Sequence, residues 1–339
     1  MPATRSSLQQ QPSRPGQLRL LPDRTPEPAT GPDPTAAPGT GGIVPSTGLD
    51  FAHTARIITY NTLTGGIDSA GDEQRRHGQM GFLASGAPDV LVLQDLRGWE
   101  EGGWWRLWEL AEAVGMVALP PVLSARERGS HLAMLYRPAT VRVAAYDAEA
   151  DSGAFFHGLA RAIVYIKDAP QSLTVLGTRL SLLGGEERLA EARWLARYGD
   201  SDGGLDRRVL LAGDLNTIGL ADDEPDWSRI PANLRSRHCL LSMDGEFGPT
   251  DRRAMNLLTA SGFRDPYELL DRQPEHTTGY WSDDELVRHR SDFILANRLA
   301  APAVRNITVH ESDTTWGLSD HLPVELTIAL TPPETEDAL

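Results

Sequence analysis

Short apolar runs, each ending at a polar side chain or a glycine, mark the chain from residue 51 onward. Apolar runs of this length, bounded by turn residues, predict buried strands. We expect strands at 56–60, 89–93, 131–136, 141–145, 159–166, 173–180, 209–212, 291–296 and 324–330. Helical spacing of apolar residues predicts helices at 73–85, 104–114, 186–198 and 254–261. Clustered strands with intervening helices indicate a layered α+β domain.

The helix at 104–114 is rich in tryptophan. Its apolar residues at helical spacing are Trp104, Trp105, Trp108, Ala111 and Val114. We expect this face to pack on a sheet rather than to form an aromatic binding surface.

Both ends of the chain differ from the middle. Residues 1–50 contain ten of the 24 prolines and few residues that could build a core, which predicts a disordered proline-rich tail. We expect one folded domain at 51–331 and a short polar tail at 332–339. The lone cysteine, Cys239, allows no internal disulfide.

The net charge of the chain indicates which binding partners it would attract. With a net charge of −15, the chain has no general basic field to attract nucleic acid. Apolar runs stay well short of the roughly 20 residues that span a membrane, and the N-terminus lacks the apolar segment of a secretory signal. We therefore expect a cytoplasmic protein.

Two stretches carry the strongest candidate chemistry. In residues 209–217, VLLAGDLNT, an apolar run ends at Gly213, which allows a sharp bend and places Asp214 and Asn216 at the strand's end. In residues 318–324, LSDHLPV, Asp320 and His321 lie between apolar residues. Asn61, Asp95 and Asp292 also lie at the ends of predicted strands. Such oxygen ligands suit Mg²⁺, Mn²⁺ or Ca²⁺.

These motifs resemble the endonuclease/exonuclease/phosphatase superfamily, which has the deoxyribonuclease-like fold. The resemblance covers about 55–330 and rests on TYNT around Asn61, LVLQD ending at Asp95, GDLNT, HRSDFIL around Asp292, and LSDHLPV. It implies a four-layered α/β/β/α sandwich of two mostly antiparallel sheets flanked by helices. It also implies a site at one edge of the sandwich, where the two sheets meet.

The resemblance further implies a role for each residue. Asp95 would bind Mg²⁺ (or Mn²⁺), with Asn61 and Asp320 beside it. Asp214 and Asn216 would align the attacking water and the phosphate. His321, paired with Asp292, would hold a proton or stabilise charge on the phosphorane. Arg290 would support this edge.

Two positions depart from the family pattern. The metal-binding residue after Gln94 is usually Glu and here is Asp95, which is shorter. Where many members have Thr-His-Leu, this chain has Thr178-Arg179-Leu180. An arginine stays protonated, so Arg179 cannot act as a general acid, but it can bind a phosphate. His131 is a candidate substitute that faces the substrate, and His157 and His276 are further candidates.

The leading hypothesis is a metal-dependent phosphoesterase acting on a phosphodiester or phosphomonoester. The acidic charge favours a small phosphorylated molecule or a lipid headgroup over duplex DNA. One alternative is a nuclease acting on DNA or RNA. Another is a protein that has lost hydrolysis and either binds a partner or carries out a different reaction on a metabolite, with Arg179 holding an anionic group.

Overall fold

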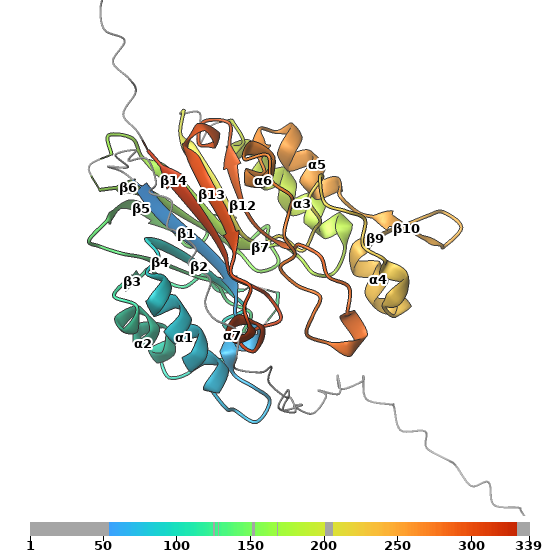
Figure 1. Cartoon of the computed structure of the whole chain (residues 1–339), viewed down its shortest axis with the longest axis horizontal. Helices are drawn as coiled ribbons and strands as arrows, with labels where there is room; N and C mark the ends of the chain where they lie inside the picture. The colour runs from blue at the N-terminus through green and yellow to red at the C-terminus, as the bar shows by residue number, and fades with distance from the viewer. Residues whose placement is uncertain are drawn as a thin grey trace, which may run out of the picture. The chain divides into compact units, whose positions relative to one another are not determined.

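Two six-stranded sheets form the centre of the fold (Figure 1). The structure is a computed structural model that describes residues 54–330, apart from 125, 128, 151–152, 168 and 201–205. The predicted tails at 1–50 and 332–339 lie outside the described residues, and the domain boundaries remain predictions.

The first sheet combines strands from the two ends of the described chain. Its strand order is β13-β14-β1-β2-β4-β3. Only the β1–β2 pair is parallel; the other pairs in this sheet are antiparallel. The bounds are β1 Thr54–Asn61, β2 Val90–Gln94, β3 Val117–Ala118, β4 Ala133–Tyr136, β13 Val304–Val309 and β14 Val324–Ala329.

The second sheet repeats this pattern of pairing. Its strand order is β11-β12-β8-β7-β6-β5, and only β7–β8 is parallel. The bounds are β5 Val141–Asp147, β6 Leu159–Ile166, β7 Leu173–Arg179, β8 Arg208–Asp214, β11 Phe263–Arg264 and β12 Asp292–Asn297. Two mostly antiparallel sheets confirm the central layers of the predicted sandwich.

Helices cover the outer face of each sheet (Figure 1). One apolar cluster, including Leu83 and Leu107, joins the first sheet to α1 (Gln74–Gly86) and α2 (Trp105–Ala113). Another, including Leu195 and Leu258, joins the second sheet to α3 (Gly185–Leu195) and α5 (Arg253–Ala260). A third cluster fills the space between the sheets. The four-layered α/β/β/α prediction is therefore confirmed.

The packed face of α2 differs from the prediction. Its buried residues are Leu107, Leu110, Ala111 and the following Val114, spaced i, i+3, i+4 and i+7. Trp105 and Trp108 are 42% and 47% exposed, so placing them on the buried face was wrong. Successive residues of an α-helix are turned by about 100° from one another. The stripe that begins at Leu107 therefore faces a different side of the helix from Trp105 and Trp108, and this side packs against the sheet.

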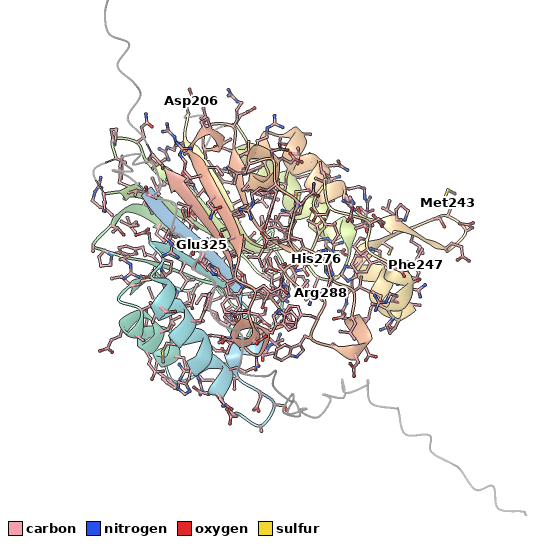
Figure 2. All side chains as sticks on the ribbon, in the orientation of Figure 1. Asp206, Met243, Phe247, His276, Arg288 and Glu325 are labelled. Carbon is pink, nitrogen blue, oxygen red and sulfur yellow. The ribbon has the colours of Figure 1, made fainter. Side chains whose placement is uncertain are left out.

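The segment between β8 and α5 was not predicted. It contains the 3₁₀ turn Trp227–Arg229, helix α4 (Ala232–His238) and a hairpin of β9 (Cys239–Leu241) and β10 (Phe247–Thr250). Met243 projects from the hairpin tip (Figure 2). The short helices α6 (Pro266–Leu269) and α7 (Asp313–Trp316) were also missed. Within the described residues, no helix is long and apolar enough to cross a membrane.

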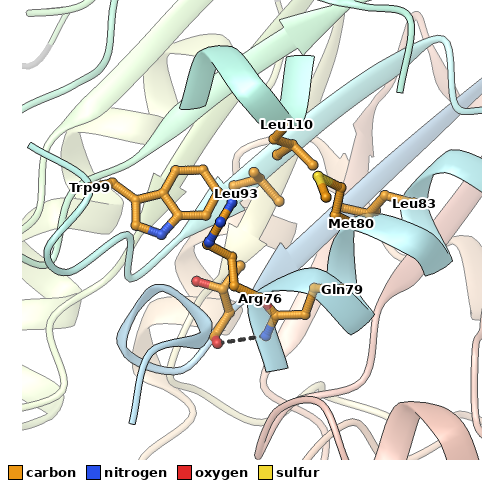
Figure 3. Close-up of a pocket in the computed structure, with 8 residues that line it drawn as sticks. Arg76, Gln79, Met80, Leu83, Leu93, Trp99 and Leu110 are labelled. Carbon is orange, nitrogen blue, oxygen red and sulfur yellow. Dashed lines mark hydrogen bonds between the residues drawn. The ribbon is translucent and has the colours of Figure 1, made fainter. Parts of the chain in front are cut away.

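A polar contact beneath α1 fixes the loops that lead to the site. Gln79 Nε2 donates to the carbonyl oxygens of Thr62, at 2.8 Å, and Leu318, at 2.7 Å. Gln79 borders a small cavity of about 10 Å³ that Arg76 and Trp99 also line (Figure 3). The loop after β1 and the loop before His321 are thereby held to one helix.

Candidate active site

Five strand ends bring the predicted residues to one edge of the sandwich. Asn61 ends β1 and Asp95 directly follows β2, both in the first sheet. In the second sheet, Arg179 ends β7, Asp214 ends β8 and Asp292 begins β12. In register, Asp214 pairs with both Arg179 and Asp292. Residues that are far apart in sequence therefore meet where the two sheets come together.

Unusual backbone geometry accompanies this edge. A Cβ atom on Gly213 would lie 1.8 Å from the Thr178 carbonyl oxygen, so only glycine allows β7 and β8 to approach this closely. Asp95 and Asn216 have positive φ angles of 58° and 47°. Such angles are uncommon for residues other than glycine and tend to cluster at functional sites.

Asp214 is the hub of the site. Its fully buried carboxylate accepts hydrogen bonds through Oδ2 from Asn61 Nδ2, at 3.0 Å, and from Arg179 Nε, at 3.3 Å. Asn216 donates its backbone N–H to Oδ1 and its side-chain amide to Oδ2. Burial acts to raise the pKa of Asp214, but the charges of His321 and Arg179 lower it overall. Asp214 is therefore ionised and orients three polar side chains.

His321 forms a buried pair with Asp292. Its Nδ1 lies 2.8 Å from Asp292 Oδ2, and its Nε2 lies 4.0 Å from Asp214 Oδ2. Thr277 Oγ1 also donates to Asp292 Oδ2, at 2.6 Å. Burial favours a neutral imidazole, but Asp292, Asp214 and Asp320 raise the pKa of His321 to about 10. The protonated ring thus presents a positive Nε2–H on the Asp214 side.

Arg179 lies between two carboxylates. Its Nη1 is 3.5 Å from Asp95 Oδ1, its Nε bonds Asp214, and Nη1 donates to Ser130 Oγ at 2.8 Å. Thr64 N donates to the other oxygen of Asp95. Burial acts to raise the pKa of Asp95, and Arg179 is the strongest influence lowering it. The arginine in place of the usual histidine is therefore a fixed cation inside the site.

The residues at this edge fit a divalent cation. Asp95 Oδ1 is buried and accepts no hydrogen bond from the described residues, so it is a candidate metal ligand, although the Arg179 and Arg97 guanidinium groups lie 3.5 and 3.6 Å away. Asp214, Asp292 and His321 form an additional group, with ligand atoms within 4.8 Å of one another. In that group the His321 Nδ1–H is engaged by Asp292, which leaves carboxylate oxygens as the available ligands. Asn61 and Asp320 remain predicted metal ligands.

The three candidate substitute histidines occupy different surroundings. His131 Nδ1 accepts from Ser124 N, its ring contacts Trp104 at a tilt of 58°, and its carbonyl oxygen accepts from Leu96 N, next to Asp95. His157 is completely buried, and burial together with Arg179 lowers its pKa to about 3, so it is neutral at pH 7. His276 is exposed near the start of the segment that leads to β12 (Figure 2). Substrate contact by His131 remains a prediction.

Arg290 has a structural environment of its own. Its guanidinium bonds Asp222 at 2.6 Å and Asp265 at 2.5 Å, with the arginine 3% exposed. It also lies over the rings of Tyr267 and Phe293. Arg290 therefore links the loop after β8 to the start of α6. It lies two residues before the site residue Asp292 in the sequence.

We expect Arg290→Met to destabilise the protein by about 3 kcal/mol, because two nearly buried carboxylates lose their shared counterion. Urea unfolding followed by circular dichroism measures this change. Arg298→Met is the control: Arg298 is 62% exposed and its partner Asp200 is 69% exposed, so its loss should cost less than about 1 kcal/mol. Equal stabilities of the two variants would contradict this account.

An open pocket of about 170 Å³ begins at this edge. Arg179, Asn216, Asp320 and His321 line its inner side. Its other walls contain residues that the sequence analysis did not identify: Arg188, Trp227, Arg237, His238, Trp281, Glu285 and His289. No strand-end motif marks these positions, because they come from α3, from the unpredicted segment after β8 and from the loop before β12.

Comparison with known proteins places this geometry in a class. The profile described as Endonuclease/Exonuclease/phosphatase family matches residues 58–321. The chain belongs to this family, as the motifs indicated. No curated protein matches the sequence.

Solved structures share the fold. An endonuclease/exonuclease/phosphatase from Bacteroides vulgatus is 15% identical, with a TM-score of 0.59 over 82% of this chain and 99% of that one. D. rerio TDP2 complexed with single strand DNA product is 20% identical, with a TM-score of 0.56 over 81% and 98%. The AP endonuclease LMAP from Leishmania major is 16% identical, with a TM-score of 0.56 over 84% and 90%. At these identities the likeness concerns the fold alone.

Proposed function

We propose that the protein is a divalent-metal-dependent phosphoesterase that hydrolyses a phosphodiester or phosphomonoester by in-line attack of water. The observation that carries this proposal is the convergence of the His321–Asp292 pair, Asp214 and Asn216 at one edge of the sandwich, where His321 and Asn216 line the pocket. Family membership supports it, since members of this family generally hydrolyse phosphoester bonds with divalent metals.

The chain's own residues supply positioning and charge. Arg179 and the Asn216 amide bind the phosphoryl oxygens at the inner end of the pocket. The protonated His321 stabilises the negative charge that develops as the new P–O bond forms and the ester P–O bond breaks. Asp214 lies beneath these groups and fixes their orientation. Asp95, Asn61 and Asp320 would hold the metal, which supplies Lewis-acid neutralisation of the phosphate and lowers the pKa of a bound water.

The preferred substrate is a small phosphorylated molecule or a lipid headgroup. The net charge of −15 opposes the approach of long duplex DNA, and the pocket is limited in volume. Nuclease activity is the alternative that the structurally similar proteins support, because one was solved with single strand DNA product and another is named an AP endonuclease. The other alternative is a protein that has lost hydrolysis or carries out a different reaction on a metabolite. It draws on Arg179, which replaces the usual histidine and is held by Asp95 and Asp214.

Hydrolysis of bis(4-nitrophenyl) phosphate should require Mg²⁺ or Mn²⁺, vanish with excess EDTA and return when metal is restored. Initial rates across a metal titration measure this dependence. Plasmid DNA is assayed in parallel, and nicking at a higher kcat/KM than that of the small diester would support the nuclease alternative. Hydrolysis that is unchanged after complete removal of metal would contradict the proposed mechanism.

A further inference from the structure

One buried arginine next to the site differs from the others. Arg76, Arg188 and Arg290 are each 3% exposed or less. Arg76 pairs with Glu73 and Glu109, and Arg290 pairs with two aspartates. Arg188 has no carboxylate within 4.0 Å among the described residues. Its Nη1 and Nη2 donate to the carbonyl oxygens of Ser181 and Arg237, and no acceptor in the described part of the chain reaches its Nε.

The carboxylates near Arg188 are engaged elsewhere. Asp251 bonds the guanidinium of Arg253 at 2.6 Å. Glu191 accepts the backbone N–H groups of Phe156 and Ser181, and burial raises its pKa to about 7. Burial also lowers the pKa of Arg188, against the weaker opposing fields of Asp251 and Glu191. A buried charge is costly unless it is paired, so buried charges usually have a partner. The described residues supply no such anion to Arg188.

Arg188 lies where a ligand could supply that anion. Arg188 and Arg237 line the same pocket as Arg179 and His321. Arg188 also holds the backbone of Arg237, whose side chain is 39% exposed. Glu285 lies 3.2 Å from Arg237 Nη1 and is 42% exposed, so this carboxylate is a weak counterion at the surface.

Three aromatic side chains, Trp227, His238 and His289, form a neutral part of the pocket wall. Trp227 stacks on His238 with ring centroids 4.2 Å apart, and His289 packs edge-on against Trp227. Burial lowers the pKa of both histidines, so neither carries charge at pH 7. An apolar cluster of Ile218, Trp227, Ile230, Cys239 and Val287 supports this wall.

We propose that Arg237, with the buried charge of Arg188 beneath it, forms a second anion-binding subsite of this pocket, so that the ligand is a small molecule with two anionic groups. One group would bind at the reacting edge beside Arg179 and the other at Arg237. This inference rests on the proposed function, because the first group is the phosphate to be hydrolysed. In the absence of ligand, Glu285 partly neutralises the second subsite.

The test is calorimetric binding of non-hydrolysable probes in the presence of Mg²⁺. Propane-1,3-bisphosphonate and hexane-1,6-bisphosphonate are compared with propylphosphonate, which has one anionic group. At least one bisphosphonate should bind about tenfold or more tightly than propylphosphonate. Arg237→Gln should remove this advantage, and Glu285→Gln should increase it. Arg298→Gln, a distant exposed arginine, should leave it unchanged.

The same variants distinguish loss of the second subsite from loss of folding and from loss of hydrolysis. Arg188→Gln should also abolish the advantage, and Arg237→Gln keeps the test valid if the buried variant does not fold. Thermal unfolding of Arg237→Gln should stay close to that of wild type, because the Arg237 side chain is 39% exposed. Absence of hydrolysis in wild type counts against the proposed function alone, since probe binding does not depend on it.

Two results would overturn the second subsite. One is equal affinity for the bisphosphonates and propylphosphonate. The other is an advantage that persists in Arg237→Gln. A five-nucleotide thymidine strand that binds more tightly than either bisphosphonate, with the same loss in Arg237→Gln, would overturn the small-molecule assignment.

Discussion

Asp214→Asn should lower turnover by about 10³-fold while leaving the fold intact. The substitution keeps the shape of the side chain but replaces one carboxylate oxygen by an NH₂ group. That group would face Asn61, Asn216 and Arg179, which all donate to Asp214 in the wild type. Two of the residues lining the inner pocket, Arg179 and Asn216, would lose their common acceptor, and His321 would lose a nearby negative charge.

Steady-state hydrolysis of bis(4-nitrophenyl) phosphate, with thermal unfolding measured on the same samples, tests this expectation. Asp244→Asn is the matched control, because Asp244 is exposed at the hairpin tip next to Met243 and should retain wild-type rates. If Asp214→Asn hydrolyses the diester as fast as wild type, the assigned role of Asp214 is wrong.

Arg179→Met should change metal binding and catalysis in opposite directions. The guanidinium lies 3.5 Å from Asp95 Oδ1, so its charge opposes a cation at that oxygen. Removing it should tighten Mg²⁺ binding by about tenfold or more. Turnover should nevertheless fall by about 100-fold, because the fixed cation that faces the phosphate is lost. Calorimetric titration with Mg²⁺ and initial-rate kinetics measure the two effects.

Arg97→Met provides a graded comparison for this test. Arg97 lies 3.6 Å from the same Asp95 oxygen but is 43% exposed, so solvent screens its charge. Its loss should change Mg²⁺ affinity less than that of Arg179. Weaker Mg²⁺ binding in Arg179→Met would show that the arginine supports the metal site. Turnover that survives both EDTA and Asp214→Asn but is lost in Arg179→Met would favour a different reaction on a metabolite.

Nine of the fourteen strands in the described residues were predictable from local apolar runs, whereas β3, β9, β10, β11 and β13 were missed. The meeting of the site residues at one edge was implied by the family resemblance. Apolar runs such as 159–166 match β6 residue for residue. Asp214 ends β8 and Asp292 begins the neighbouring β12, and these positions follow from where one apolar run stops and the other starts. Those features need only the positions of the short apolar runs, which the chain displays directly.

The outer pocket was not predictable because its residues have no shared local signal. Trp227 and His238 come from the polar segment after β8, and His289 comes from a different loop. Their stacking depends on tertiary packing alone. The uncompensated charge of Arg188 is likewise visible only once its neighbours are known, since in the sequence Glu186, Glu187 and Glu191 surround it.

The order in which strands join the first sheet has a consequence for synthesis of the chain. β1 pairs with β14, and the whole second sheet is encoded between them. At about 5–20 residues per second, a ribosome would need roughly 15 to 50 seconds after β1 to deliver β14. During that interval one edge of β1 has no neighbour and is open to pairing with other chains. His321, which precedes β14, is added in the same late step, so nascent chains complete their catalytic edge only as they close this sheet.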